Sequence, residues 1–123
     1  MAITAVIGAQ WGDEGKGKIV DYLSRKADYV VRFHGGAGAG HTIVNRLGTT
    51  KLHLIPSGIF HEKAICVIAG GVVVNPPRLL EEIAGLKKLG VKIRGRLLIS
   101  PRCQVVMPYH EILTGFLMKP RAI

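Results

Sequence analysis

A carboxylate, two lysines and several glycines lie close together near the start of the chain, in a spacing that suits phosphate binding. Residues 12–18 read G-D-E-G-K-G-K and fit the pattern G-x-x-x-x-G-K between a predicted strand and a predicted helix. In such a loop the backbone N–H groups point at a phosphate, and the N-terminus of the following helix adds partial positive charge. Lys18 would then reach the terminal phosphates of a nucleotide. The alternative is a tight strand-to-helix turn without a ligand.

The residue after Lys18 bears on how a metal ion would be held. It is Ile19, where the usual pattern has a serine or threonine that ligates Mg²⁺. Because Mg²⁺ prefers oxygen ligands, another donor has to take this place. The carboxylates of Asp13 and Glu14 are the candidates, and Asp13 is the better placed of the two.

A second glycine-rich loop spans residues 35–42 and ends in His41 and Thr42. Successive strands that each end in a glycine-rich loop bring both loops to one edge of a parallel sheet, where ligands bind. Asp13 and His41 would then face one small molecule, as general base and general acid. We interpret the other four histidines as surface residues or as interior residues whose hydrogen bonds are satisfied: His34, His53, His61 and His110.

The strands that must hold these loops follow from the hydrophobic pattern. Short apolar runs predict strands at residues 3–7, 29–33, 64–69 and 96–100, the first of them buried. A hairpin is predicted from residues 42–44 and 51–55, with its turn around Gly48.

Two helices are predicted between these strands. Residues 18–26 place Ile19, Tyr22 and Leu23 on one apolar face. Residues 76–89 follow Asn75 as an N-cap, carry Glu81 and Glu82 early in the helix, and stop at Gly90. The alternation of strands and helices indicates an α/β fold with a mainly parallel sheet and P-loop-like phosphate-binding loops.

Composition excludes several classes of protein. The 123 residues are 48% hydrophobic and 20% charged, which excludes a disordered chain. No apolar run approaches the roughly 20 residues of a membrane-spanning helix, and no basic region precedes the first apolar stretch. Two cysteines are too few for a disulfide framework. We therefore expect a soluble, cytoplasmic protein.

The charge is unevenly distributed along the chain. The net charge is +9, and residues 83–123 hold eight basic side chains against the single acidic Glu111. A solvated basic face, an anionic ligand and an acidic partner surface are the open explanations. A nucleic-acid-binding protein is disfavoured, because no aromatic residue interleaves the basic positions of residues 87–102.

One stretch gives a resemblance to a known family. Residues 7–18, I-G-A-Q-W-G-D-E-G-K-G-K, resemble the first signature of the adenylosuccinate synthetases. The loop that closes with residues 39–42 follows at the spacing of that family, and residues 52–58 and 100–103 strengthen the likeness. The resemblance runs from residue 3 to about residue 113.

The resemblance implies a GTP-dependent ligase of purine biosynthesis. Such enzymes join IMP and L-aspartate with GTP and Mg²⁺, through a 6-phosphoryl-IMP intermediate, to give adenylosuccinate, GDP and phosphate. Asp13 would remove the N1 proton of IMP, and His41 would act at the phosphate that is transferred. Family members are typically homodimers. The alternative is a stand-alone GTP- or phosphate-binding module without catalysis.

The resemblance also implies three overlapping sets of site residues. The GTP phosphates would contact Gly12, Asp13, Glu14, Gly15, Lys16, Gly17, Lys18, Gly40, His41 and Thr42. IMP would lie against Asp13, Glu14, Gly15, Lys16, Gly38, Ala39, Gly40 and His41. Mg²⁺ would be held by Asp13 and the backbone oxygen of Gly40.

Two features depart from the family pattern. Gly38 stands where the family ordinarily has an asparagine that contacts IMP, so we expect weaker IMP binding. The family is several times longer, and its guanine-reading and aspartate-binding segments have no counterpart here. We therefore expect residues 1–123 to be an N-terminal segment of a GTP-binding domain, part of a larger single domain, with a divergent tail at residues 114–123.

Overall fold

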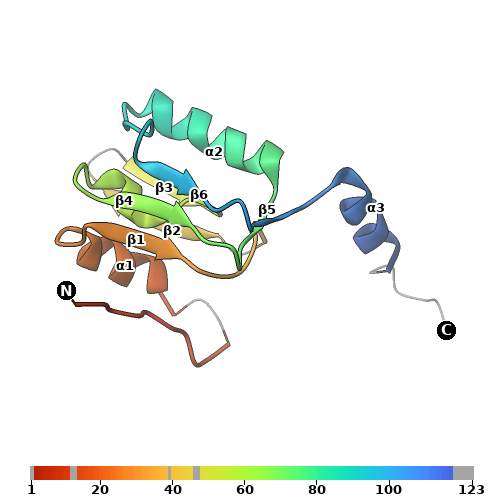
Figure 1. Cartoon of the computed structure of the whole chain (residues 1–123), viewed down its shortest axis with the longest axis horizontal. Helices are drawn as coiled ribbons and strands as arrows, with labels where there is room; N and C mark the ends of the chain where they lie inside the picture. The colour runs from red at the N-terminus through yellow and green to blue at the C-terminus, as the bar shows by residue number, and fades with distance from the viewer. Residues whose placement is uncertain (1, 12–13, 39, 46–47, 118–123) are drawn as a thin grey trace.

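The computed structural model describes residues 2–11, 14–38, 40–45 and 48–117. Its centre is a three-stranded parallel sheet in the order β1 (Tyr29–Arg32), β4 (Ile65–Ile68) and β6 (Leu97–Ile99) (Figure 1). The register pairs Val30 with Cys66 and Cys66 with Leu97. The strands predicted at these places are confirmed, and so is the α/β class with a parallel sheet.

Two small sheets flank this centre. β2 (His41–Asn45) and β3 (Gly48–Leu52) form an antiparallel hairpin, as predicted. Its second strand does not lie at the predicted residues 51–55, because it starts at Gly48, which has a φ of 110°, and ends at Leu52. β5 (Val73–Val74) pairs in parallel with β7 (Gln104–Val105). The hairpin begins at His41, so the second glycine-rich loop leads directly into it.

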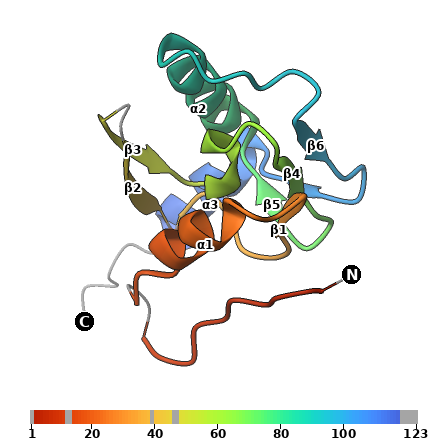
Figure 2. The same ribbon diagram turned by 90° about the vertical axis from the view of Figure 1, so that its left-hand side faces the viewer.

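One face of the three-stranded sheet carries the core. Figure 2 shows α1 (Lys16–Ser24), the 3-10 helix η1 (Ser57–Phe60) and α2 (Pro76–Lys88) on the same side of the sheet. The buried residues include Val30, Cys66 and Ile68 from the sheet and, from the elements over it, Ile43, Leu52, Leu54, Ile55, Ile59, Leu79 and Leu86.

The opposite face of the sheet is uncovered by the described part of the chain. Tyr29, Val31 and Leu98 are about half exposed, and Ile65 and Val67 alternate with the buried residues of β4. We call these five residues the open sheet face. Parallel sheets are normally covered on both faces, so this surface is unusual for a complete α/β domain.

The strand predicted at residues 3–7 is wrong. The structure has no strand there, and the side chains of Ile3 and Ile7 are 88% and 73% exposed. The segment runs past α1 and β1 without joining the sheet (Figure 1). The outer edge of β1 is unpaired, but a strand added there would leave its apolar side chains exposed on the open sheet face, which the described residues do not cover.

The apolar face predicted for the first helix is also wrong. α1 spans Lys16–Ser24, and Ile19, Tyr22 and Leu23 are all exposed. The packed side instead presents the half-buried Val20 and the buried Ser24, whose Oγ donates to the Val20 carbonyl at 2.5 Å. Small residues face inward because η1 approaches closely.

The second helix forms as predicted. In α2 the Asn75 side chain accepts a hydrogen bond from the Arg78 N–H at 3.2 Å, and Gly90 ends the helix with a φ of 79°. Glu81 and Glu82 lie beyond the first turn, so the interaction predicted for them with the helix dipole is wrong. Glu82 has a different set of partners, described below.

A third helix was not predicted. α3 spans Pro108–Leu117 and projects away from the rest of the molecule (Figure 1). Pro108 is the first residue of this helix, a position that suits proline. Tyr109, Ile112 and Leu113 are exposed on it. None of the helices in the described ranges is long and apolar enough to cross a membrane.

Candidate active site

The first glycine-rich loop ends in a left-handed residue that starts α1. Gly15 has a φ of 78°, and its carbonyl accepts the Lys18 N–H at 3.0 Å. Within the described residues no side chain caps this helix end. The first N–H groups of α1 are therefore available to a ligand, as a phosphate-binding loop requires.

Glu14 makes contacts within the first glycine-rich loop and with the start of α1. Its carboxylate is ion-paired with Lys16 and accepts the Gln10 N–H at 3.3 Å. This pairing places the Lys16 ammonium beside the loop, where it can also meet a phosphate group.

The second loop is in direct contact with the first helix. A Cβ built on Gly17 would lie 2.8 Å from the Cβ of His41, closer than real side-chain atoms pack. The Gly17 carbonyl also accepts a hydrogen bond from Ser57 Oγ at 3.4 Å. α1 and the start of β2 are thus packed together with no room for a side chain at position 17.

Arg32, at the end of β1, holds the second loop from beneath. Its Nη2 donates to the Gly36 carbonyl at 2.9 Å, its Nη1 donates to the His53 carbonyl, and its Nε donates to the His34 carbonyl at 3.4 Å. His53 Nδ1 adds a hydrogen bond to the Ala37 carbonyl at 2.9 Å. Two side chains therefore fix consecutive carbonyls of the loop.

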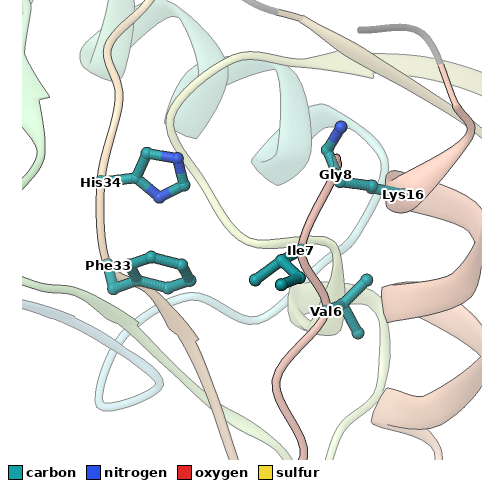
Figure 3. Close-up of a pocket in the computed structure, with 6 residues that line it drawn as sticks. All are labelled: Val6, Ile7, Gly8, Lys16, Phe33 and His34. Atoms are coloured by element: carbon teal, nitrogen blue, oxygen red, sulfur yellow. The ribbon is translucent and has the colours of Figure 1, made fainter. Parts of the chain in front are cut away.

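Between the loops lies a cleft of about 860 Å³. Its walls come from α1 and the residues before it, from the end of β1 and from the start of the hairpin, and they include Glu14, Gly15, Lys16, Gly17, Lys18, Gly38, Gly40, His41, Thr42 and Lys51. A smaller pocket of about 340 Å³ adjoins it, with Lys16 and Gly8 on one wall and Phe33 and His34 on the other (Figure 3). The volume of the larger cleft suits a nucleotide.

His41 is electrostatically unusual among the histidines. Burial, and to a smaller extent the electrostatic influence of Arg32 and His53, together lower its pKa to about 4. The imidazole is therefore neutral at pH 7 and can donate one hydrogen bond. An anionic phosphate in the cleft would oppose the charges of Arg32 and His53 and raise the pKa of His41.

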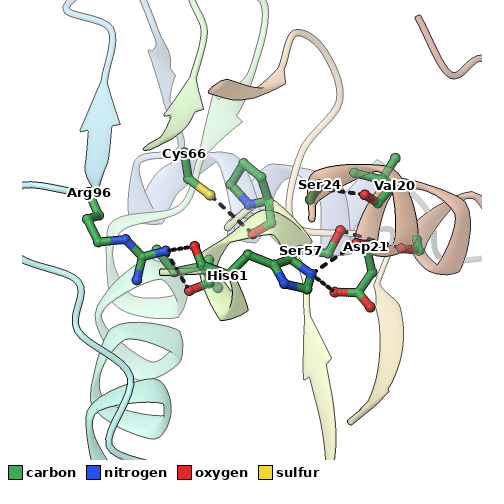
Figure 4. A network of polar contacts seen from close by, with 10 residues as sticks. Val20, Asp21, Ser24, Ser57, His61, Cys66 and Arg96 are labelled. Carbon is green, nitrogen blue, oxygen red and sulfur yellow. Dashed lines mark hydrogen bonds and ion pairs between the residues drawn. The ribbon is translucent and has the colours of Figure 1, made fainter. Parts of the chain in front are cut away.

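Polar contacts anchor α1 and η1 behind the cleft (Figure 4). His61 Nε2 lies 3.0 Å from Asp21 Oδ1 and 2.9 Å from the Asp21 carbonyl, which joins η1 to α1. Arg96 donates to the Ile59 carbonyl at 3.0 Å and to the His61 carbonyl, which joins β6 to η1. Burial raises the pKa of the Cys66 thiol to about 12, so this cysteine stays protonated.

The family follows from comparison with known proteins. The family model described as adenylosuccinate synthetase matches residues 5–119 of this chain. The chain belongs to the adenylosuccinate synthetase family. The resemblance of residues 7–18 is thereby confirmed.

Individual relatives agree with this assignment. The adenylosuccinate synthetase of Chlorobium luteolum is 58% identical over 110 residues, 89% of this chain and 25% of the relative. The fully ligated adenylosuccinate synthetase of Plasmodium falciparum has a TM-score of 0.81 and 42% identity, over 89% of this chain and 25% of the other. A cyanophage S-2L succinoaminodeoxyadenylate synthetase, bound to dGMP and to dATP as an energy donor, has a TM-score of 0.71 and 25% identity, over 87% and 30%.

The chain spans about a quarter of the length of the adenylosuccinate synthetases it matches. Of the predicted site residues, Gly12, Asp13 and Ala39 lie outside the described residues. The others come together around the cleft, which brings the two loops to one place. The other four histidines were predicted to be surface or hydrogen-bonded interior residues. His53, His61 and His110 are hydrogen-bonded, and His34 is exposed beside Phe33.

Sequence reasoning missed three residues that organise this adenylosuccinate synthetase site. Arg32 and His53 hold the second loop, and Glu82 holds the backbone of residues 53–55. Arg32 carried a usable signal, since it is a charged residue at the end of an apolar strand that leads into glycines. The partners of Glu82 lie 27–29 positions away in sequence and gave no local signal.

We expect Gly17→Ala to destabilise the chain. In a helix this change normally stabilises by about 0.5–1 kcal/mol, but here the added Cβ would meet His41 at 2.8 Å. The expected loss is about 1–3 kcal/mol of unfolding free energy, measured by urea denaturation. Gly38→Ala is the control, because nothing lies within 4 Å of its added Cβ. Equal stability of the two variants would refute the tight contact.

We also expect the unfolding free energy to rise with pH between about 4 and 6.5 because of His41. Its pKa is lowered from 6.5 to about 4 on folding, so the unfolded chain binds more protons in this window. The contribution is at most about 3–4 kcal/mol, since one pKa unit corresponds to about 1.4 kcal/mol. It is present above pH 6.5 and lost as the pH falls to 4. Urea unfolding of the wild type and His41→Asn measures it, and parallel pH profiles would contradict it.

Proposed function

We propose that this chain forms the phosphate-binding part of an active site that joins IMP and L-aspartate at the expense of GTP. The products are adenylosuccinate, GDP and phosphate, as in the AMP branch of purine biosynthesis. The observation that carries the proposal is the contact of Gly17 with His41, because it unites the two glycine-rich loops in one cleft. Residues 1–123 are then an N-terminal segment of one GTP-binding domain.

The proposed reaction has two steps. Asp13 removes the N1 proton of IMP, and the resulting oxyanion at C6 attacks the γ-phosphorus of GTP and releases GDP. The amine of L-aspartate then attacks C6 of the 6-phosphoryl intermediate and releases phosphate. Phosphoryl transfer depends mainly on positioning and on stabilisation of charge, which loops of backbone N–H groups and lysines supply.

The described residues have defined tasks in this scheme. The N–H groups at the start of α1 and the ammonium groups of Lys16 and Lys18 bind phosphate oxygens. His41 donates a hydrogen bond to the phosphoryl group, and its proton becomes transferable as the phosphate raises its pKa. Thr42 and the backbone of Gly40 border the same phosphates. Glu14, Gly15 and Gly38 line the side of the cleft assigned to IMP.

A magnesium ion fits the donor set only if the substrate supplies most of its ligands. The described residues contain no group of three or more His, Cys, Asp or Glu side chains that could hold a metal. One carboxylate from Asp13 and one backbone oxygen from Gly40, completed by phosphate oxygens and water, is a normal set for Mg²⁺. When bound there, Mg²⁺ supplies neutralisation of the phosphate charge.

The second candidate is a phosphate-binding module without catalysis. It would use the same cleft, whose walls include the start of α1 and the two lysines Lys16 and Lys18. Such a module would bind GTP and ATP equally, because no base-reading segment contributes. For the ligase, in contrast, we propose small-molecule substrates and a second subunit as partners. We propose a cytoplasmic location and no binding to nucleic acid or to a membrane.

Turnover in a complete chain decides between the two. We define the full-length chimera as residues 1–117 of this protein followed by the rest of the Chlorobium luteolum relative. Adenylosuccinate formation from IMP, L-aspartate and GTP, followed by absorbance, is expected for the chimera. The same assay with ATP in place of GTP measures whether the chimera prefers GTP as the phosphoryl donor. A folded chimera that forms no product while the parent enzyme is active would refute the proposal. Calorimetry of the 123-residue chain with Mg²⁺–GTP and Mg²⁺–ATP measures binding separately.

A further inference from the structure

Three consecutive backbone N–H groups converge on the carboxylate of Glu82. Oε1 accepts from His53 at 2.9 Å and from Leu54 at 3.0 Å. Oε2 accepts from Leu54 at 3.2 Å and from Ile55 at 3.1 Å. Leu54 and Ile55 are fully buried, so water cannot readily replace these bonds. Glu82 therefore fixes the chain at residues 53–55 to α2.

The held segment in turn holds the second glycine-rich loop. The His53 carbonyl accepts from Arg32, whose other terminal nitrogen donates to the Gly36 carbonyl at 2.9 Å. The His53 imidazole donates to the Ala37 carbonyl at 2.9 Å. A continuous path of hydrogen bonds thus leads from α2 to the loop that ends in His41.

The charges along this path are complementary. Burial lowers the pKa of the Arg32 guanidinium, and the negative charge of Glu82 opposes that shift. Glu82 thus meets three N–H donors directly and stabilises the cation that holds the loop. The cap of helix α2 is a separate contact, because the Asn75 side chain accepts the Arg78 N–H.

We propose that Glu82 is a positioning residue for the second glycine-rich loop, acting through residues 53–55 and Arg32 to hold His41 against α1. The consequence for catalysis rests on the proposed function, whereas the positioning of the loop does not. In Glu82→Gln the glutamine side chain is nearly the same size as the glutamate. It offers only one oxygen to the three backbone N–H groups, and its NH₂ group would face donors instead of an acceptor.

The first test measures loop order in the 123-residue chain by ¹⁵N relaxation. In the wild type we expect amide order parameters of about 0.85 at Gly36, Gly38 and His41, as in rigid backbone. Glu82→Gln should reduce them below about 0.6. Glu81→Gln makes the same change at an exposed neighbour and should not. Ile83→Val weakens core packing of the same helix and should lower only the melting temperature.

Arg32→Lys provides an independent variant, because lysine keeps the charge but cannot reach two carbonyls at once. If Glu82→Gln does not fold, Arg32→Lys decides. Loss of order at Gly36 and His41 in the folded variants supports the proposal. Unchanged order in them, or an equal loss in Ile83→Val, overturns it.

The second test measures kinetics in the full-length chimera. Glu82→Gln should lower kcat about 100-fold, the effect of displacing a reacting group by about 1 Å. The KM for L-aspartate should stay constant, since the resemblance places that site beyond this chain. An unchanged kcat would overturn the catalytic consequence. Full activity of His41→Ala would refute the proposed function. The order parameters would still test, independently of activity, whether Glu82 positions the loop.

Discussion

His41→Ala in the full-length chimera is expected to lower kcat by about 10²–10⁴-fold, the range for removal of a general acid or base. The imidazole lies at the contact between α1 and the hairpin, and it lines the cleft between the loops. Its removal takes away the donor assigned to the transferred phosphoryl group. Asp13→Ala should have an effect of the same order, because the N1 proton of IMP then has no base.

Matched controls separate chemistry from folding in this experiment. His110→Ala removes a histidine on α3, which projects away from the cleft, and should leave kcat unchanged (Figure 1). Steady-state kinetics with each substrate in turn, together with melting temperatures, give the comparison. Near-normal kcat in folded His41→Ala or Asp13→Ala would remove that residue from the mechanism.

Gly38→Asn is expected to lower the KM for IMP by about tenfold to a hundredfold, equivalent to a hydrogen bond of about 1.5–3 kcal/mol to a charged group. A side chain fits, because nothing lies within 4 Å of a Cβ at this position and its φ is not positive. The resemblance implies an asparagine here, and the loop around it is already fixed by Arg32 and His53.

Gly38→Ala is the control for this substitution, since it adds the Cβ without the amide. Its KM for IMP should remain at the wild-type value, and the KM for GTP should change in neither variant. An unchanged KM for IMP in Gly38→Asn would mean that other contacts already bind IMP in this protein.

Local signals explain which elements could be predicted. The runs that became β1, β4 and β6 are short, apolar and bounded by breakers. The helix after Asn75 carries its own start and stop signals, which the structure uses. The prediction for residues 3–7 failed because a strand buried in a parallel sheet needs a cover on both faces, and the described part of the chain leaves one face open. The predicted face of α1 failed because close packing selected Val20 and Ser24 over larger apolar residues.

The candidate site was predictable to the same degree. The two glycine-rich loops do share a cleft, as predicted, but not by the predicted route, because residues 3–7 form no strand of the sheet. The loops meet through the contact of Gly17 in α1 with His41 at the start of β2. The supporting shell was not predictable, because Arg32, His53 and Glu82 act through backbone groups of other segments. Nothing in the residue types at positions 53–55 shows that their N–H groups need a carboxylate.

The open sheet face has a consequence during synthesis. In a chain of the relatives' length that began with this segment, about three quarters of the polypeptide would remain to be made. At about 5–20 residues per second, the ribosome needs tens of seconds to make it. Tyr29, Val31 and Leu98 stay half exposed throughout that interval. Such a nascent chain would present this surface to chaperones that bind apolar segments, and the time needed to make later segments would set how long the surface must be shielded.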